Sequence, residues 1–212
     1  MRVRFREVDF RVRNLLFRKK INYKLTCGAT TFVKLQGGNN YCAPETVMKQ
    51  KICASPNVDY AQPKTCLRGK RNEEEILKLY VKKTKNKIYK INNSVKLGWH
   101  CHKDYKWLCT EADAITCNGI LVEIKNSKLR LKKDLLQVYI ALEIFQLRKA
   151  HLVYCTNSAN VEIIEVLPNA QYLRENLAEV RKKMSDVYYY LKNPIISNTS
   201  MDCGLADVKI FQ

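Results

Sequence analysis

The sequence has 212 residues, 46% of them hydrophobic, and its 38 lysines and arginines against 20 aspartates and glutamates give a formal net charge of +18. This hydrophobic content excludes a disordered chain, and no apolar run approaches the roughly 20 residues of a membrane-spanning helix. The positive charge favours a polyanionic partner, most often nucleic acid. A basic solubilising surface and contact with an acidic membrane are alternatives, but the interleaved tyrosines and lysines favour nucleic acid.

The N-terminal third is basic and rich in breaks. Apolar and charged residues alternate over residues 8–13, which predicts a half-buried strand rather than a mitochondrial targeting helix. Glycines and prolines make residues 36–69 irregular, apart from a short helix predicted to begin at Pro44-Glu45. A longer helix is predicted over 72–83, because Asn72 suits an N-cap and the three glutamates that follow suit the positive end of a helix.

The second half of the chain predicts the order strand, strand, helix, strand, strand, helix. A turn at Cys117-Asn118-Gly119 separates two apolar stretches within 115–125, which predicts a β-hairpin. The elements that follow are predicted as a helix over 134–147, strands over 151–156 and 161–166, and a helix over 169–191. This order indicates a mixed α/β fold in which helices flank one central sheet.

We expect a single domain with three segments. They are a basic N-terminal strand and irregular segment (1–64), a catalytic core (65–167), and a C-terminal helix with its tail (168–212).

One constellation of residues indicates chemistry. Asp113 is followed, after nine intervening residues, by Glu123-Ile124-Lys125. Side chains two apart on a strand share a face, so Glu123 and Lys125 point the same way, and the hairpin brings Asp113 beside Glu123. Two carboxylates suit Mg²⁺, and an adjacent lysine can position water for attack on phosphorus. The alternative is that Glu123 and Lys125 are exposed strand charges and Asp113 a turn residue, although charges in an apolar strand are costly to bury without a partner.

The nine cysteines are scattered without paired spacing, and the N-terminus lacks the apolar segment of a secretory signal. We therefore expect reduced thiols in an intracellular protein that is not secreted. A zinc site is the alternative interpretation of one cluster, although the sequence contains no Cys-x-x-Cys pair. The residues of this cluster are His100, Cys101, His102, Cys109 and Cys117.

Several motifs resemble those of lambda-exonuclease-type (YqaJ-type) viral recombinases, and they follow the family's order over residues 65–167. The similar segments are Arg68-Gly69-Lys70-Arg71-Asn72-Glu73, Gly98-Trp99, Tyr105-Lys106-Trp107-Leu108, Glu111-Ala112-Asp113-Ala114, Val122-Glu123-Ile124-Lys125 and Leu136-Gln137-Val138-Tyr139. The sequence departs from the family where Ser-Pro-Asp-Gly is replaced by Glu111-Ala112-Asp113-Ala114. It departs again where Tyr139 occupies a position at which the family has glutamine.

The resemblance implies a PD-(D/E)xK nuclease fold and a metal-dependent enzyme that degrades one strand of double-stranded DNA from its 5′ end in viral recombination, replication or repair. It implies that Asp113, Glu123, the Ile124 carbonyl and Glu73 bind Mg²⁺ or Mn²⁺. Lys125 would then handle the nucleophilic water, and Gln137 would orient the water or the lysine. A single-strand annealing protein as partner, a ring-shaped homo-oligomer, and a host nucleus or cytoplasm as location follow in the same way.

Two alternatives to an exonuclease remain. The chain could be a catalytically degenerate DNA-binding subunit of the same fold, which the altered Glu111–Ala114 turn would suit, or a structure-specific endonuclease that uses the same metal site.

Basic side chains near the predicted metal site are candidates for DNA contacts. Arg68, Lys70 and Arg71 adjoin Glu73 and are candidates for a 5′-phosphate. The loop that carries Lys128, Arg130, Lys132 and Lys133 is a candidate to follow the DNA backbone, with a solvated loop as the equal alternative.

The aromatic residues outside the motifs are expected to be structural. Tyr188-Tyr189-Tyr190 are interpreted as core and rim of the last helix rather than as base-stacking residues. Trp107 is interpreted as a core residue rather than as a contact of the DNA end.

Overall fold

The computed structural model describes residues 16–18, 24–37, 42–53, 64–90, 97–126, 132–157 and 160–193. The strand predicted over residues 8–13 lies outside these ranges. The elements in chain order are β1 (Leu16–Arg18), β2 (Cys27–Gly28), α2 (Ala29–Leu35), α3 (Pro44–Cys53), α4 (Lys64–Thr84), β3 (Trp99–Cys101), β4 (Leu108–Thr110), β5 (Ala114–Ile115), β6 (Leu121–Lys125), α5 (Lys132–Phe145), β7 (Ala150–Asn157), β8 (Asn160–Val166) and α6 (Ala170–Lys192).

The main sheet has four strands in the order β5-β6-β7-β8. β5 and β6 form the predicted hairpin, and Gly119 in its turn has φ 80°, a conformation that glycine adopts without strain. β6 and β7 are parallel, which requires the crossover that α5 supplies, and β7 pairs with β8 in the antiparallel sense. The element order predicted for the second half of the chain is therefore confirmed.

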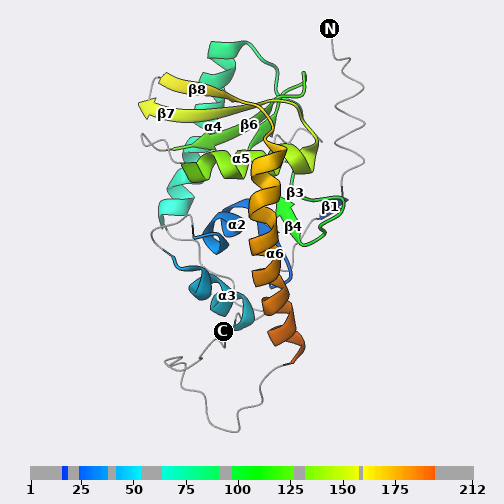
Figure 1. The fold of residues 1–212 in the computed structure, drawn as a ribbon. Coiled ribbons are helices and arrows are strands. Elements are labelled where there is room, and N and C mark those ends of the chain that lie inside the picture. The colour runs from blue at the N-terminus through cyan, green and yellow to red at the C-terminus, as the bar shows by residue number, and fades with distance from the viewer. Residues whose placement is uncertain are drawn as a thin grey trace.

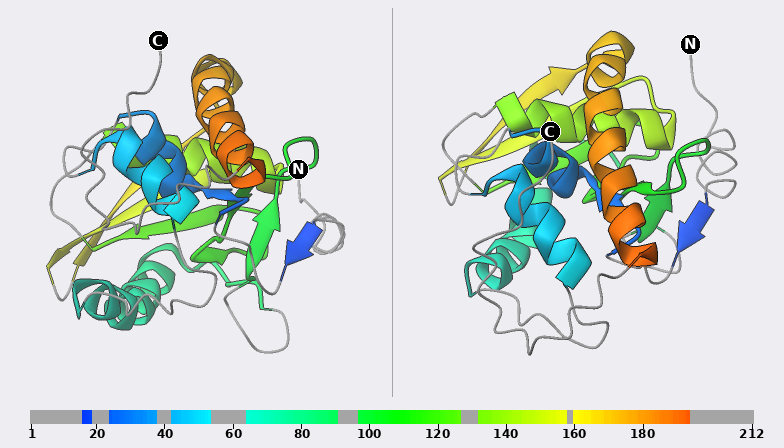
Figure 2. Two further views of the ribbon diagram at one scale, coloured as in Figure 1. Left: turned by 90° about the horizontal axis from the view of Figure 1, so that it is seen from below. Right: turned by 60° about the horizontal axis from the view of Figure 1, so that its bottom comes forward.

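Helices cover both faces of the main sheet. Figure 1 and Figure 2 show α5 on one side of the strands and α4 on the other. Alternation along the strands produces two separate apolar layers, because successive side chains point to opposite faces. Leu121 and Leu152 pack in the cluster that contains α5, whereas Val122 and Val153 pack against α4. Glu123 and Lys125 share the parity of Leu121, so they belong to the face that α5 covers.

A second sheet of four short strands, in the order β1-β3-β4-β2, adds to the single predicted sheet. β3 is antiparallel to both β1 and β4, while β2 runs parallel to β4 with Cys27 opposite Leu108. Strands of two or three residues are too short to show a sequence period, which explains why the sequence did not predict them.

A third apolar cluster joins α2, α3 and α6 to the outer side of α5. It contains Phe32, Ile140 and Val180, and Trp107 packs against it as predicted. The N-terminus of α6 is capped by Asn169, whose side chain accepts a hydrogen bond from the Tyr172 N–H at 2.9 Å. This cluster attaches the long C-terminal helix to the rest of the fold.

The three tyrosines near the end of α6 lie in different environments. Tyr188 packs against the same cluster, and its hydroxyl donates to the Leu25 carbonyl at 2.7 Å. Tyr189 is 64% exposed. Tyr188 therefore lies at the rim of the core and Tyr189 at the surface, which agrees with the interpretation of this run as core and rim rather than as core alone.

The start of the helix predicted at Asn72 is wrong. α4 begins at Lys64, so Asn72 lies in the helix interior and the glutamates after it do not occupy the first turn. Residues 64–69, expected to be irregular, are helical. The cap signal failed because an N-cap contributes only about 1 kcal/mol, and the lysines and arginines that precede Asn72 are good helix formers.

The other predicted helices are confirmed within two or three residues at each end. They are the helices at Pro44, over 134–147 and over 169–191. None of the helices in the described ranges has a stretch long and apolar enough to cross a membrane.

Candidate functional site

The site is built first from the β5–β6 hairpin. Asp113 immediately precedes β5, and its Oδ2 accepts a hydrogen bond from the backbone N–H of Ile124 at 2.7 Å. This bond crosses the hairpin and fixes the Asp113 carboxylate at the strand that carries Glu123. The carboxylates of Asp113 and Glu123, ten residues apart in sequence, therefore meet at one place, as the sequence predicts.

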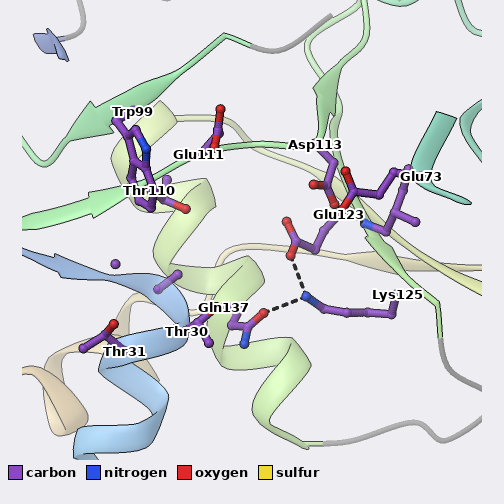
Figure 3. A pocket seen from close by; sticks show the side chains of 13 residues that line it. Thr30, Thr31, Glu73, Trp99, Thr110, Glu111, Asp113, Glu123, Lys125 and Gln137 are labelled. Carbon is purple, nitrogen blue, oxygen red and sulfur yellow. Dashed lines mark hydrogen bonds and ion pairs between the residues drawn. The ribbon is translucent and has the colours of Figure 1, made fainter. Parts of the chain in front are cut away.

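Lys125 is held by two oxygen acceptors from different elements. Its Nζ lies 2.6 Å from Oε1 of Glu123, two residues earlier on β6, and 2.7 Å from Oε1 of Gln137 on α5. Figure 3 shows the ammonium between these two side chains. Only 20% of the Lys125 side chain and 14% of the Glu123 side chain are exposed. Gln137 thus fixes the position of the lysine, one of the two orienting roles that the resemblance implies for it.

These groups line a cavity of about 310 Å³ at the junction of the two sheets, α2, α4 and α5. Glu73 reaches the cavity from α4, so the structure brings all five predicted catalytic side chains together, along with Ile124. The lining residues are Gly28, Ala29, Thr30, Thr31, Glu73, Trp99, Thr110, Glu111, Asp113, Glu123, Ile124, Lys125 and Gln137.

The cavity has an unbalanced charge. Burial, and then the neighbouring Glu123 carboxylate, raise the pKa of Asp113 well above its usual range, against the opposing effect of the Ile124 N–H. Burial alone would lower the pKa of Lys125, but the charge and the hydrogen bond of Glu123 outweigh it, so this pKa is raised. Lys125 therefore stays an ammonium at neutral pH, while Asp113 ionises only at a cost. Additional positive charge in the cavity would relieve that cost.

The donor set fits a hard divalent cation. Asp113, Glu123 and Glu73 offer carboxylate oxygens, and Mg²⁺ is commonly bound by one or two carboxylates together with water and substrate phosphate. Within the described ranges, no group of three or more His, Cys, Asp or Glu side chains is placed so that it could hold a metal ion, so Glu73 does not complete a three-carboxylate site with Asp113 and Glu123. The arrangement is that of a partial ligand set, which waters and a phosphate oxygen would complete.

The predicted DNA-binding residues are placed only in part. Arg68, Lys70 and Arg71 lie on α4, in the stretch whose side chains the structure does not describe, and Lys128 and Arg130 fall outside the described residues. Lys132 is exposed, but it is the first residue of α5 rather than part of a loop. Their contacts with DNA stay predictions.

Several residues that line the cavity received no role from the sequence. Trp99 and Glu111 belong to motifs that were recognised, so their motif positions were an available signal. Thr30 and Thr31 carried no such signal, because nothing in the sequence placed residues 28–31 beside the hairpin. The N-terminal segment thus contributes a wall of the cavity.

A second polar pair lies behind the site. The Tyr154 hydroxyl, opposite Lys125 on β7, donates to Oδ2 of Asp134 in the first turn of α5 at 2.8 Å. Both residues are buried, with exposed fractions of 2% and 4%. The Asp134 charge also favours the ammonium form of Lys125. This hydrogen bond ties the start of α5, and with it Gln137, to the sheet.

The histidines and cysteines that suggested zinc do not form a metal-binding group among the described residues, although Sγ of Cys101 lies 2.9 Å from Sγ of Cys109. Nδ1 of His100 is bonded to the Gly98 carbonyl at 3.0 Å, while Nδ1 of His102 accepts from the backbone N–H groups of Asp104 and Tyr105. Local backbone bonds therefore occupy one nitrogen of each ring, which is a structural role.

Among the comparisons with known proteins, the one with solved structures identifies the fold. No family model matches the sequence, and no curated protein matches it. Among solved structures, LHK-Exo in complex with dAMP superposes with a TM-score of 0.67 at 12% identity, covering 81% of this chain and 93% of LHK-Exo. The alkaline exonuclease LHK-Exo from Laribacter hongkongensis gives 0.64 at 12% identity, covering 80% and 92%. A phage-related exonuclease from Haemophilus somnus 129PT gives 0.53 at 9% identity, covering 80% and 94%.

At these identities the likeness concerns the fold. The mixed α/β fold is shared with these exonucleases over 92% to 94% of their length. The chain has the lambda-exonuclease-type fold.

Proposed function

We propose that this protein is a Mg²⁺-dependent deoxyribonuclease, with Mn²⁺ as a second usable ion. The observation that carries the proposal is the convergence of Asp113, Glu123 and Lys125 in one cavity, with Gln137 bonded to the lysine. This donor set, in a chain of net charge +18, suits cleavage of a polyanion. The fold shared with alkaline and phage exonucleases supports the same activity.

Asp113 and Glu123 would hold the metal, with Glu73 and the Ile124 carbonyl as further ligands. A bound divalent ion supplies neutralisation of the phosphate charge and a more acidic water. Asp113 is oriented for this role by the Ile124 N–H.

Lys125 acts as a donor in this proposal. Because its pKa is raised, the ammonium is charged at neutral pH and positions a water or a phosphate oxygen rather than removing a proton. Gln137 and Glu123 fix its direction. Hydrolysis forms a bond from the water oxygen to phosphorus and breaks the bond from phosphorus to the leaving oxygen, on which negative charge develops; the attacking water gives up its proton to solvent, and the leaving oxygen takes a proton from solvent. A fixed cation beside that charge lowers the barrier.

The substrate we propose is the end of double-stranded DNA, digested from 5′ to 3′ during viral recombination, replication or repair. LHK-Exo, which shares the fold, is known in complex with the mononucleotide dAMP, and an exonuclease releases mononucleotides. A ring-shaped homo-oligomer and a single-strand annealing partner belong to the same proposal.

The test is digestion of end-labelled linear duplex DNA with Mg²⁺, with Mn²⁺ and with EDTA. We expect metal-dependent degradation by the wild type, none by Lys125→Ala or Asp113→Ala, and normal activity in Lys182→Ala, an exposed lysine on α6 outside the cavity. The label's position gives the polarity.

Two other outcomes would change the assignment. Cleavage of circular duplex would indicate an endonuclease, because an exonuclease needs an end. Tight DNA binding without cleavage in either metal would replace the enzyme with a degenerate DNA-binding subunit.

A further inference from the structure

The cavity has two chemically different sides. Figure 3 shows Glu73, Asp113 and Glu123 together on one side, and Trp99 on the other, beside Thr110 and Glu111. The acidic side suits a metal and a phosphate. The aromatic side has no part in the chemistry proposed above.

Trp99 is a cavity residue rather than a core residue. It is the first residue of β3 and is partly exposed, and among the described residues it belongs to none of the three apolar clusters. Trp107, the other tryptophan of the sequence, packs instead against the apolar cluster that joins α2, α3 and α6 to α5. The two tryptophans therefore have different surroundings, although they lie only eight positions apart.

The backbone holds the indole in place. A Cβ built on Gly28 would lie 3.4 Å from Cζ3 and 3.5 Å from Cη2 of Trp99, so the ring packs directly against the chain where α2 begins. β3 also pairs with β4, which ends at Thr110 on the same wall. A ring fixed in this way offers a flat surface with little further loss of conformational freedom on binding.

We propose that Trp99 stacks on the base of the terminal nucleotide while that nucleotide's scissile phosphate lies at Asp113, Glu123 and Lys125. The proposal rests on the proposed function and adds a nucleobase subsite to it. A nucleotide joins one anionic group to one flat aromatic group, and the cavity presents a matching surface for each. Its volume of about 310 Å³ is at the small end of ligand sites, which suits a single nucleotide.

The subsite predicts which DNA ends the protein accepts. Every base has a π-face, so stacking on Trp99 is tolerant of sequence. An end whose terminal nucleotides lack bases loses this contact, and the protein should discriminate against it.

Tryptophan fluorescence tests the subsite directly, because the sequence contains only two tryptophans. Each is replaced separately, as Trp99→Phe and Trp107→Phe, and the proteins are titrated with dAMP or with 2-deoxyribose 5-phosphate in Mg²⁺. We expect dAMP to quench Trp107→Phe, which retains Trp99, and not Trp99→Phe. Deoxyribose phosphate, which has no base, should quench neither. Equal responses of the two variants to dAMP, or no response in either, would overturn the proposal.

Kinetics provide the second readout. On normal duplex ends, Trp99→Ala should raise KM by roughly fivefold to a hundredfold, the range expected for one base–aromatic stack, and Trp99→Phe should recover most of this. On duplexes with abasic residues at both ends, wild type and Trp99→Ala should have similar KM values. An equal loss on both substrates would mean that Trp99 is only structural, and the subsite would be wrong.

The two proposals fail in different ways. If the wild type cleaves DNA while Trp99 does not respond to dAMP, only the subsite is wrong. If Trp99 responds to dAMP and not to the abasic sugar phosphate, but no DNA is cleaved, the hydrolase is wrong and the nucleotide site stands.

Discussion

Replacement of Lys125 by methionine should destabilise the metal-free protein strongly, although the residue is charged and sits at a cavity. Its Nζ lies 2.6 Å from Glu123 Oε1, and only 20% and 14% of the two side chains are exposed. Removal of one partner of a buried pair costs about 3–5 kcal/mol, because the remaining charge stays uncompensated. Because both side chains are partly exposed, we expect the loss in free energy of unfolding to be about 3 kcal/mol, the lower end of this range. Methionine keeps most of the apolar stem, so packing contributes little to the loss.

The same reasoning makes the Glu123 substitution asymmetric. Glu123→Gln removes a partner of Lys125, but it also removes the charge that raises the pKa of Asp113, and Lys125 keeps its bond to Gln137. We expect a cost of about 1 kcal/mol or less, the scale of one hydrogen bond. In the Lys125→Met background, Glu123→Gln should restore roughly 1–3 kcal/mol, the coupling expected for residues in contact.

The assay is urea unfolding in EDTA, followed by far-UV circular dichroism, for the wild type, both single variants and the double variant. When the same variants are unfolded by heat, a loss of ~3 kcal/mol in the free energy of unfolding corresponds to a fall in Tm of roughly 6–12 °C for a chain of this size. Lys132→Met is the control, since an exposed substitution should change the free energy of unfolding by about 0.5 kcal/mol at most. Additive effects of the two substitutions, or no loss in Lys125→Met, would refute the electrostatic account of the cavity.

Three further predictions follow from buried charges. Because the pKa of Asp113 is raised, its carboxyl does not change the free energy of unfolding below its ordinary pKa, and it destabilises the metal-free protein increasingly as the pH rises above that value. Asp113→Asn should therefore abolish cleavage and yet raise the urea midpoint in EDTA at pH 7. An unchanged midpoint would contradict this prediction. Tyr154→Phe leaves the buried Asp134 carboxylate without its 2.8 Å donor and should cost about 1–3 kcal/mol, which a fall in Tm would reveal. Burial lowers the pKa of Lys51 to about 8. Between about pH 8 and 10.5 the Lys51 amine is therefore protonated in the unfolded chain but not in the folded one, and the free energy of unfolding should rise with pH. Lys51→Met should remove this rise in urea midpoints measured across the same range.

The catalytic strand could be predicted because its signal is local. A strand has a period of two, so Glu123 and Lys125 had to share a face, and the turn at Gly119 had to return the chain past Asp113. Gln137 could be expected from a motif and then placed by a helix whose bounds were nearly right. These inferences needed only a few neighbouring residues each.

The sequence placed Glu73 at the metal site by means of a helix start that is wrong. With α4 beginning at Lys64, Glu73 lies well inside the helix, and it faces the cavity because the helix packs across the sheet through Ile76, Leu77 and Tyr80. A helix that began at Asn72, as predicted, would instead have placed the Glu73 carboxylate in the first helical turn, next to the N-cap. Glu73 does line the cavity, but tertiary packing rather than a helix cap places it there, and its role in metal binding stays a prediction.

The sequence by itself determined the polar half of the site, and the tertiary structure decided the other half. Asp113, Glu123 and Lys125 lie within thirteen positions of one another, where strand period and turn chemistry fix the geometry. Trp99 and Thr30 reach the same cavity through strands of two or three residues whose pairing joins Cys27 to Leu108. Such short strands carry no period, and a register between positions so far apart is set by the packing of the whole core, which no local pattern encodes.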